Sequence, residues 1–128
     1  MVINNIENIT PTVRGDLKSK MIKVFKEFNI TISISFLPSN SSTLGNCHNH
    51  TSEVIYIIKG ESFVDINGKE FKIKAGDYFF VPADIDHKFY SSDNGLELLA
   101  FLSPALDPKN PDIKNIASTQ ERTSNKAI

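Results

Sequence analysis

Hydrophobic and polar residues alternate in the middle of the chain. From Ile30 to Phe36 every second residue is Ile or Phe, and the residues between them are Thr or Ser. This period of two is typical of a half-buried β-strand. A second run, Glu53 to Lys59, is β-branched and aromatic with little polarity, which predicts a central strand covered on both faces. No long helical pattern competes with these strands.

Turn residues separate further short strands. Asn67-Gly68 lies between Phe63–Ile66 and Phe71–Ile73. Asn-Gly supplies the positive φ angles that a two-residue type I′ turn requires, so these segments predict a hairpin. The other expected strands are Tyr78–Val81, one that begins near His87, Leu96–Leu102, and Lys18–Lys26, for which a short helix is the alternative. Short strands with turns between them predict an all-β sandwich or barrel.

The chain divides into three parts by composition. Its 128 residues suit one domain, which we place at residues 20–106. Residues 1–19 form an N-terminal segment with a short strand, and residues 107–128 a polar, mostly irregular tail with a possible short helix around Asp112–Ser118. We expect residues after Thr119 to be mobile.

Composition narrows the function classes. The apolar runs are far shorter than the ~20 residues that span a bilayer, and the first ten residues lack the features of a signal peptide, so we expect a cytoplasmic protein without a membrane partner. The net charge of −1 is evenly scattered, which argues against nucleic acid as a partner. Cys47 is the only cysteine, so no internal disulfide can form.

All three histidines of the chain lie in two short segments. In the first segment His48 and His50 stand two residues apart, which puts both imidazoles on one face of a strand. Glu53 follows, and six residues separate it from Gly60. This segment resembles the first motif of the cupin superfamily, which reads Gly, His-x-His, three or four residues, Glu, six residues, Gly.

The second segment resembles the second cupin motif, which reads Gly, five residues, Pro-x-Gly, two residues, His, three residues, Asn. Gly76, Pro82 and His87 match at the expected spacing. Asp84 replaces the glycine, and Ser91 stands where the family often has Asn. Together the two motifs extend the resemblance over roughly residues 30–103.

The cupin resemblance implies a double-stranded β-helix, a jelly-roll-like barrel, that holds one divalent metal ion. The implied ligands are His48, His50, Glu53 and His87. Iron, manganese, nickel, cobalt, copper and zinc all suit imidazole and carboxylate ligands, so the metal stays open. Small cupins commonly pair, and the resemblance therefore implies a homodimer.

The first motif departs from the family pattern, and this leaves alternatives open. Only two residues separate His50 from Glu53. In a regular strand His48 and Glu53 would point to opposite faces, so a shared site requires a bulge or loop between them. A rival register puts Cys47 and Asn49 in the two histidine positions and turns His48 and His50 outward. The short spacing between His50 and Glu53 also leaves a third alternative open, a structural or interaction barrel whose motif is vestigial.

An open metal site favours catalysis over a purely structural role. A structural zinc site would be closed by four ligands, usually with several cysteines. The resemblance implies a metal-dependent enzyme, a dioxygenase or an isomerase or lyase, that acts on a small oxygen-rich metabolite. A noncatalytic module that binds a small ligand is the alternative.

Side chains near the motifs are candidates for the substrate pocket. If their side chains face inward, Tyr56, Tyr78, Phe80 and Phe89 would line an apolar pocket above the ion, and Tyr90 is a candidate proton donor. Arg14 and the lysines Lys18, Lys20 and Lys23 could hold a substrate carboxylate, although a solvated charged face is the commoner arrangement.

Overall fold

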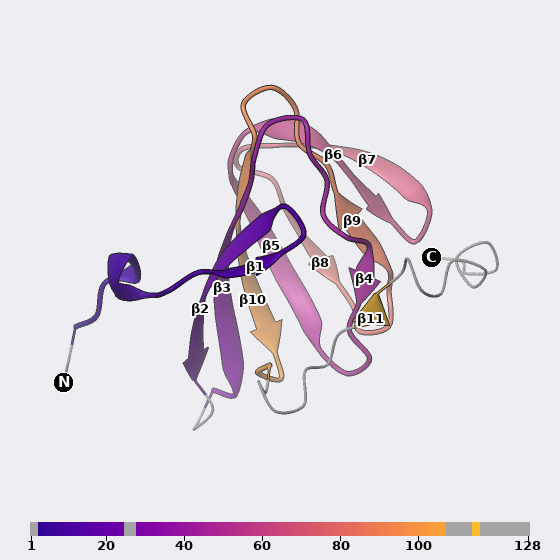
Figure 1. Cartoon of the computed structure of the whole chain (residues 1–128). Coiled ribbons are helices and arrows are strands. Elements are labelled where there is room, and N and C mark those ends of the chain that lie inside the picture. Colours follow the sequence, from indigo (N-terminus) through magenta and orange to yellow (C-terminus); the bar gives the residue numbers. More distant parts are fainter. Residues whose placement is uncertain (1–2, 25–27, 107–113, 116–128) are drawn as a thin grey trace.

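Two antiparallel sheets make up nearly all of the computed structural model, which describes residues 3–24, 28–106 and 114–115 (Figure 1). The elements are the 3-10 helix η1 (Ile6–Asn8) and the strands β1 (Thr12–Arg14), β2 (Leu17–Val24), β3 (Ile30–Leu37), β4 (Asn46–Cys47), β5 (Ser52–Lys59), β6 (Glu61–Ile66), β7 (Lys69–Lys74), β8 (Tyr78–Val81), β9 (His87–Phe89), β10 (Leu96–Ser103) and β11 (Lys114–Asn115). The all-β prediction is confirmed.

The two sheets interleave along the sequence. One has six strands in the order β1-β2-β3-β10-β5-β8, and the other has five in the order β11-β4-β9-β6-β7. Strands close in sequence, such as β4 and β5, therefore belong to different sheets. This exchange of strands between sheets is the arrangement of a jelly roll.

Most of the predicted strands are present. The Asn67-Gly68 turn has φ angles of 53° and 84°, as a type I′ turn requires, and joins β6 to β7. The choice of a strand over a helix near Lys18 is confirmed by β2. The possible helix around Asp112–Ser118 is wrong at Lys114–Asn115, which form β11 and pair with β4. The other residues of that segment, and those after Thr119, lie outside the described residues.

The hydrophobic core lies between the sheets. Inward-facing residues of β5 and β10 alternate with outward-facing ones, so that Ile55 and Ile57 are buried while Tyr56 and Ile58 are exposed. The expectation that β5 is covered on both faces is therefore wrong within one chain. Among the described residues, no helix is long and apolar enough to cross a membrane.

The strand β3 has the predicted alternation, but its polar face points inward. Thr31, Ser33 and Ser35 are buried, whereas Phe36 on the opposite face is 53% exposed. A polar inner face leaves that part of the interior without tightly packed apolar side chains. A cavity occupies this region.

Candidate metal centre

A cavity of about 350 Å³ lies between the two sheets. Apolar side chains such as Ile55, Phe89 and Leu98 form much of its wall. His48, Glu53 and His87 also line it, and all three are buried, with 5%, 7% and 5% of their surfaces exposed. The cavity therefore combines an apolar wall with one buried cluster of ligand-type side chains, as small-molecule sites do.

The two sheets each contribute to this cluster. Glu53 is the second residue of β5, and it continues the inward-facing row of Ile55 and Ile57. His87 is the first residue of β9 in the opposite sheet, and His48 directly follows β4 in that sheet. The carboxylate therefore faces the two imidazoles across the interior.

A loop, and not a bulge within one strand, resolves the spacing between His48 and Glu53. The segment from His48 to Thr51 carries the chain from the five-stranded to the six-stranded sheet. It is held at both ends, because the backbone N–H of Asp84 donates to the His48 carbonyl and the Thr51 hydroxyl donates to the Pro104 carbonyl over 3.1 Å. His48 and Glu53 therefore do not lie on one continuous strand, and the alternation of side chains along a strand does not force them to opposite faces.

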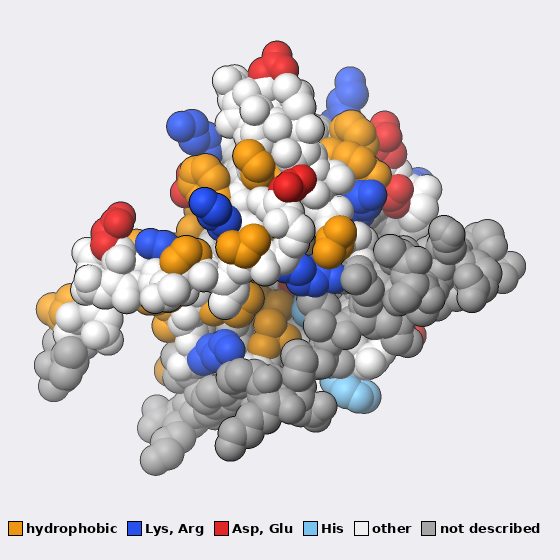
Figure 2. All heavy atoms as spheres, viewed as in Figure 1, with side chains coloured by type: hydrophobic (Ala, Val, Ile, Leu, Met, Phe, Trp, Pro, Cys, Tyr) orange, Lys and Arg blue, Asp and Glu red, His pale blue; other side chains and the backbone are white. Residues whose placement is uncertain are grey.

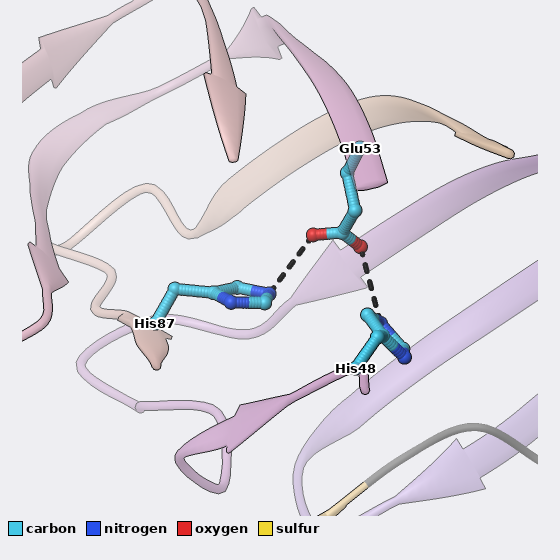
Figure 3. A group of neighbouring side chains, drawn as sticks. All are labelled: His48, Glu53 and His87. Carbon is cyan, nitrogen blue, oxygen red and sulfur yellow. Dashed lines mark ion pairs between the residues drawn. The ribbon is translucent and has the colours of Figure 1, made fainter. Parts of the chain in front are cut away.

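The three side chains converge at one point (Figure 3). The Nε2 atom of His87 lies 2.9 Å from Oε2 of Glu53, and Nε2 of His48 lies 3.4 Å from Oε1. One ligand atom from each residue lies within 4.8 Å of the other two. Ligand atoms about 2.1 Å from a shared ion stand ~3.0 Å apart at a right angle and ~3.4 Å apart at a tetrahedral angle. The two measured separations run to different oxygens of Glu53 and are of this size, so the three side chains are close enough to share one metal ion.

The hydrogen bonds of the cluster also fit a metal ion. The Nδ1 atom of His87 lies 3.1 Å from the Ile85 carbonyl, so a neutral ring that donates there keeps its lone pair at Nε2. Among the described residues, Oε2 of Glu53 makes no contact with the geometry of a hydrogen bond, despite its short distance to His87. Oε2 of Glu53 is thus a buried acceptor that faces the Nε2 lone pair of His87, and a cation between the two atoms would satisfy both.

Electrostatics keep Glu53 ionised. Burial by itself raises the pKa of its carboxyl group, but the charge of His87 and the close approach of both imidazoles outweigh burial and hold the pKa far below its usual range. Burial by itself lowers the pKa of His87, yet the Glu53 carboxylate and the Ile85 carbonyl raise it above 6.5. Protons and a metal ion therefore compete for the same ring nitrogen.

Comparison with known families identifies the chain. The model of the cupin domain family matches residues 34–102, which is more than half of the 128 residues. The chain belongs to the cupin family. This finding confirms the resemblance inferred from the two motifs, and it agrees with the observed sheets.

Several proteins of known structure or sequence are similar to this chain over most of their length. A Thermotoga maritima protein, a predicted oxalate decarboxylase, is 26% identical with a TM-score of 0.69, and the match covers 79% of this chain and 97% of that one. The Streptomyces nucleoside dehydratase Pac13 has a TM-score of 0.73 at 15% identity, over 90% of both chains, which shows a shared fold alone. An uncharacterized Methanocaldococcus jannaschii protein is 24% identical over 70% of this chain and 73% of its own.

His50, expected as a ligand, does not join the other three. It is exposed and lies outside the group formed by His48, Glu53 and His87. Because the chain leaves β4 at His48 and turns toward the other sheet, strand alternation does not carry His50 to the inner face. The structure thus gives a cluster of two histidines and one carboxylate.

Neither of the two registers considered from the sequence describes the first motif. His48 is buried while His50 is exposed, and Cys47 is buried while Asn49 is exposed. Four residues separate His48 from Glu53, within the cupin range of three or four, if His48 is the second histidine of the motif. The first histidine position then falls on Asn46, whose backbone pairs with that of His87.

Three of the four aromatic residues expected in the pocket point away from it. Tyr56, Tyr78 and Phe80 are 43%, 76% and 60% exposed, and none of them lines the cavity. Tyr56 pairs with Tyr78 across β5 and β8, and both follow the outward phase of strands whose inner positions are apolar. Phe89 is buried and lines the cavity.

Tyr90 is not placed to donate a proton in the cavity. It follows the inward-facing Phe89 and lies on the opposite side of the chain, where its ring stacks on Phe63 with a centroid distance of 4.5 Å. It does not line the cavity. Its assignment as a proton donor has no support from this geometry.

Several polar residues of the cavity were not among the expected site residues. The inner faces of β1, β2 and β3 contribute Arg14, Ser19, Ser33 and Ser35. In the sequence Arg14 is one of four N-terminal cations, and Ser33 and Ser35 belong to the alternation of β3, whereas Ser19 lies on β2. The sequence contains no signal that distinguishes a serine facing a cavity from one facing water.

Proposed function

We propose that the protein is a mononuclear metal-dependent cupin enzyme that acts on a small, oxygen-rich metabolite. The convergence of His48, Glu53 and His87, all three buried, in the wall of the cavity is the observation that carries this proposal. Cupins of similar fold include enzymes, among them Pac13 and an ectoine synthase from P. lautus.

The ligand set suits an open metal site. Two histidines and one carboxylate on one face of an octahedral ion leave up to three positions for substrate, water or dioxygen. This set is found in oxygenases that use Fe(II), and imidazole with carboxylate also binds manganese, cobalt, nickel, copper and zinc. When bound, the ion would supply Lewis-acid or oxygen activation to a chelating substrate, which suits a dioxygenase or an isomerase or lyase.

The chain itself orients the ligands and excludes water. The Ile85 carbonyl sets the tautomer of His87, and the loop from His48 to Thr51 fixes the first histidine relative to Glu53. The apolar wall around Ile55 lowers the number of water molecules that compete with a bound metabolite.

A noncatalytic small-ligand module is the second candidate. The titratable side chains among the described residues of the cavity wall are Arg14, His48, Glu53 and His87. Three of these would bind the metal, and an arginine does not donate protons at neutral pH. Reactions that need a separate protein acid are therefore disfavoured, which leaves metal-centred chemistry or plain binding.

Metal content tests the proposed site. We would purify the untagged wild type, His87→Ala and the control His50→Ala, and measure bound first-row metals by elemental mass spectrometry. We expect one metal ion per chain in the wild type and in His50→Ala, and none in His87→Ala. Absence of metal from the wild type after reconstitution would reject the proposal. A metabolite screen separates the two candidates. Product formation supports the enzyme, and stabilisation of the protein by a ligand that is not turned over supports the binding module.

We propose further that two chains pair through the outer face of the six-stranded sheet. One cross-strand row of this face runs through Ile22, Ile32, Phe101, Val54 and Phe80, and all of these side chains are apolar. At about 200 Å² per aromatic side chain, Tyr78 and Phe80, which are 76% and 60% exposed, leave roughly 270 Å² in solvent.

The size of this apolar face supports a second copy as its partner. The face extends over strands β2, β3, β10, β5 and β8, and contiguous apolar patches above a few hundred Å² mark interaction sites. A symmetric dimer would bury such a face against itself and give β5 the two covered sides that its sequence pattern indicates. Cytoplasmic location and the absence of nucleic acid or membrane partners stay predictions from the sequence.

A further inference from the structure

Buried hydroxyl groups form a cluster in the wall of the cavity. Ser19 on β2 and Ser35 on β3 are directly opposite each other, and their hydroxyl oxygens lie 2.8 Å apart. The Ser33 hydroxyl lies 3.1 Å from that of Ser35. All three side chains are buried and line the cavity. Polar groups on the inner face of a sheet are costly to bury unless they make hydrogen bonds.

The cluster retains hydrogen-bonding capacity for a ligand. Each serine has one O–H donor and two acceptor lone pairs, so three serines have three donors. The two bonds between the side chains use two of these donors. The third O–H can donate to an acceptor outside the cluster, such as a ligand oxygen in the cavity.

Arg14 adds a positive charge to the same cavity. It ends β1, the strand that pairs with β2 and lies across the molecule in Figure 1, and Figure 2 shows a recess with apolar side chains beneath this hairpin. Among the described residues of the cavity wall, Arg14 is the only lysine or arginine. Its side chain is half-buried, and desolvation lowers the pKa of the guanidinium.

We propose that the cavity binds a small organic acid whose carboxylate pairs with Arg14 and with the serine hydroxyls that line the same cavity, while its other end coordinates the metal. This inference rests on the proposed function, since the second attachment point is the ion held by His48, Glu53 and His87. A guanidinium presents paired N–H donors that match the two oxygens of a carboxylate.

The space available fits this substrate class. A volume of about 350 Å³ lies at the lower end of the range for small-molecule pockets, which is roughly 300–1,000 Å³. Apolar residues that line the same cavity, such as Leu98 and Phe89, suit a short hydrocarbon stem. A small acid with oxygen ligands at one end and a carboxylate at the other would meet both polar regions at once.

Bifunctional probes of increasing length test the inference. We would titrate the monohydroxamates of succinate, glutarate and adipate into the zinc-loaded protein by calorimetry. In each probe the hydroxamate chelates the metal and a carboxylate stands at the far end, and the matched control ends in a neutral primary amide. For at least one length we expect the acid to bind at least about tenfold more tightly than the amide, the scale of a charge-assisted hydrogen bond.

Variants assign the preference to Arg14. Arg14→Gln should abolish the preference for the acid, whereas Lys18→Gln, which removes the same charge from an exposed position on β2, should keep it. Ser35→Ala should weaken acid binding more than amide binding. Equal binding of acid and amide at every length, or a preference that persists in Arg14→Gln, would overturn the inference.

The same samples separate this inference from the proposed metal site. If the amide-terminated hydroxamates bind and elemental analysis finds one zinc ion per chain, the metal site stands even where the acids show no preference. If no zinc is retained and no hydroxamate binds, the proposed function fails, and the inference that rests on it fails with it.

Discussion

The Oε2 atom of Glu53 lies 2.9 Å from Nε2 of His87, although the two residues belong to different sheets. Their contact therefore depends on how the sheets pack, and the site exists only when the fold is complete. It also couples the proton on His87 to the charge on Glu53, because both groups are buried. The pair should make the stability of the metal-free protein depend on pH.

Metal-free protein should lose stability as the pH rises above about 6.5. The pKa of His87 is raised in the folded state, so its contribution is complete below the unfolded value of 6.5 and is lost as the pH passes the folded value. The pKa of Glu53 is depressed, so its contribution is complete above 4.5 and is lost in acid. Between pH 4.5 and pH 6.5 both His87 and Glu53 therefore contribute to the stability of the metal-free protein.

Chemical denaturation across pH measures this effect. With one extra proton on the folded state, the free energy of unfolding should fall by up to about 1.4 kcal/mol per pH unit above pH 6.5. Metal-loaded protein should show the opposite trend, because binding requires the unprotonated ring of His87. A metal-free protein whose unfolding free energy does not decline over this range would contradict the assigned pair.

Glu53→Gln should weaken metal binding and flatten this pH dependence. The amide has nearly the same shape as the carboxylate but carries no charge, so it neither raises the pKa of His87 nor provides an anionic ligand. We expect metal affinity to fall by more than about 100-fold, above the usual effect of an outer-shell partner. Isothermal titration with Zn²⁺ measures the affinity, and unchanged binding would exclude Glu53 as a ligand. His50→Ala serves as the control that should bind normally.

Gly60→Ala should destabilise the protein much more than Gly76→Ala. Both glycines have similar positive φ angles, +98° and +95°. A Cβ atom at Gly60 would lie 2.4 Å from the Gly95 backbone oxygen, whereas one at Gly76 has no neighbour within 4 Å. Each variant should lose about 1–2 kcal/mol from backbone strain, and Gly60→Ala a further ~1–3 kcal/mol from the clash. Equal unfolding free energies would contradict the contact.

Local patterns in the sequence predicted the strands, the hairpin and the family, because alternation, Asn-Gly turns and the motif spacings are properties of short segments. These patterns failed where the direction of a side chain depends on the course of the backbone from one strand to the next. His48 and His50 share a face only if the strand continues, and the chain leaves the strand at His48. The pairing of His48 with Glu53 comes from a crossing between sheets, which no spacing along one strand encodes.

The interior face of β3 shows a second limit of sequence patterns. Its alternation was visible, but the usual assignment of apolar residues to the interior does not hold, since Ser33 and Ser35 are buried and Phe36 is exposed. A polar inner face fits a sheet whose cavity binds a ligand, and an apolar outer face fits a sheet that a partner covers. The ligand and the partner are not part of the chain, so the periodicity of its sequence cannot indicate them.

Phe80→Lys should convert a dimer into a monomer without loss of metal. Phe80 is 60% exposed on β8 and lies in the apolar row of the proposed dimer face, on the opposite face of the sheet from the inward-facing cluster. A lysine there would leave a charge to be desolvated within the proposed interface. Phe71→Lys makes the same change at an exposed site on β7, in the other sheet, and should leave the assembly intact. Light scattering after size-exclusion chromatography reports the mass of each variant. A monomeric wild type, or dimers in both variants, would show that this face does not join two chains, and the exposed row would then require a different partner.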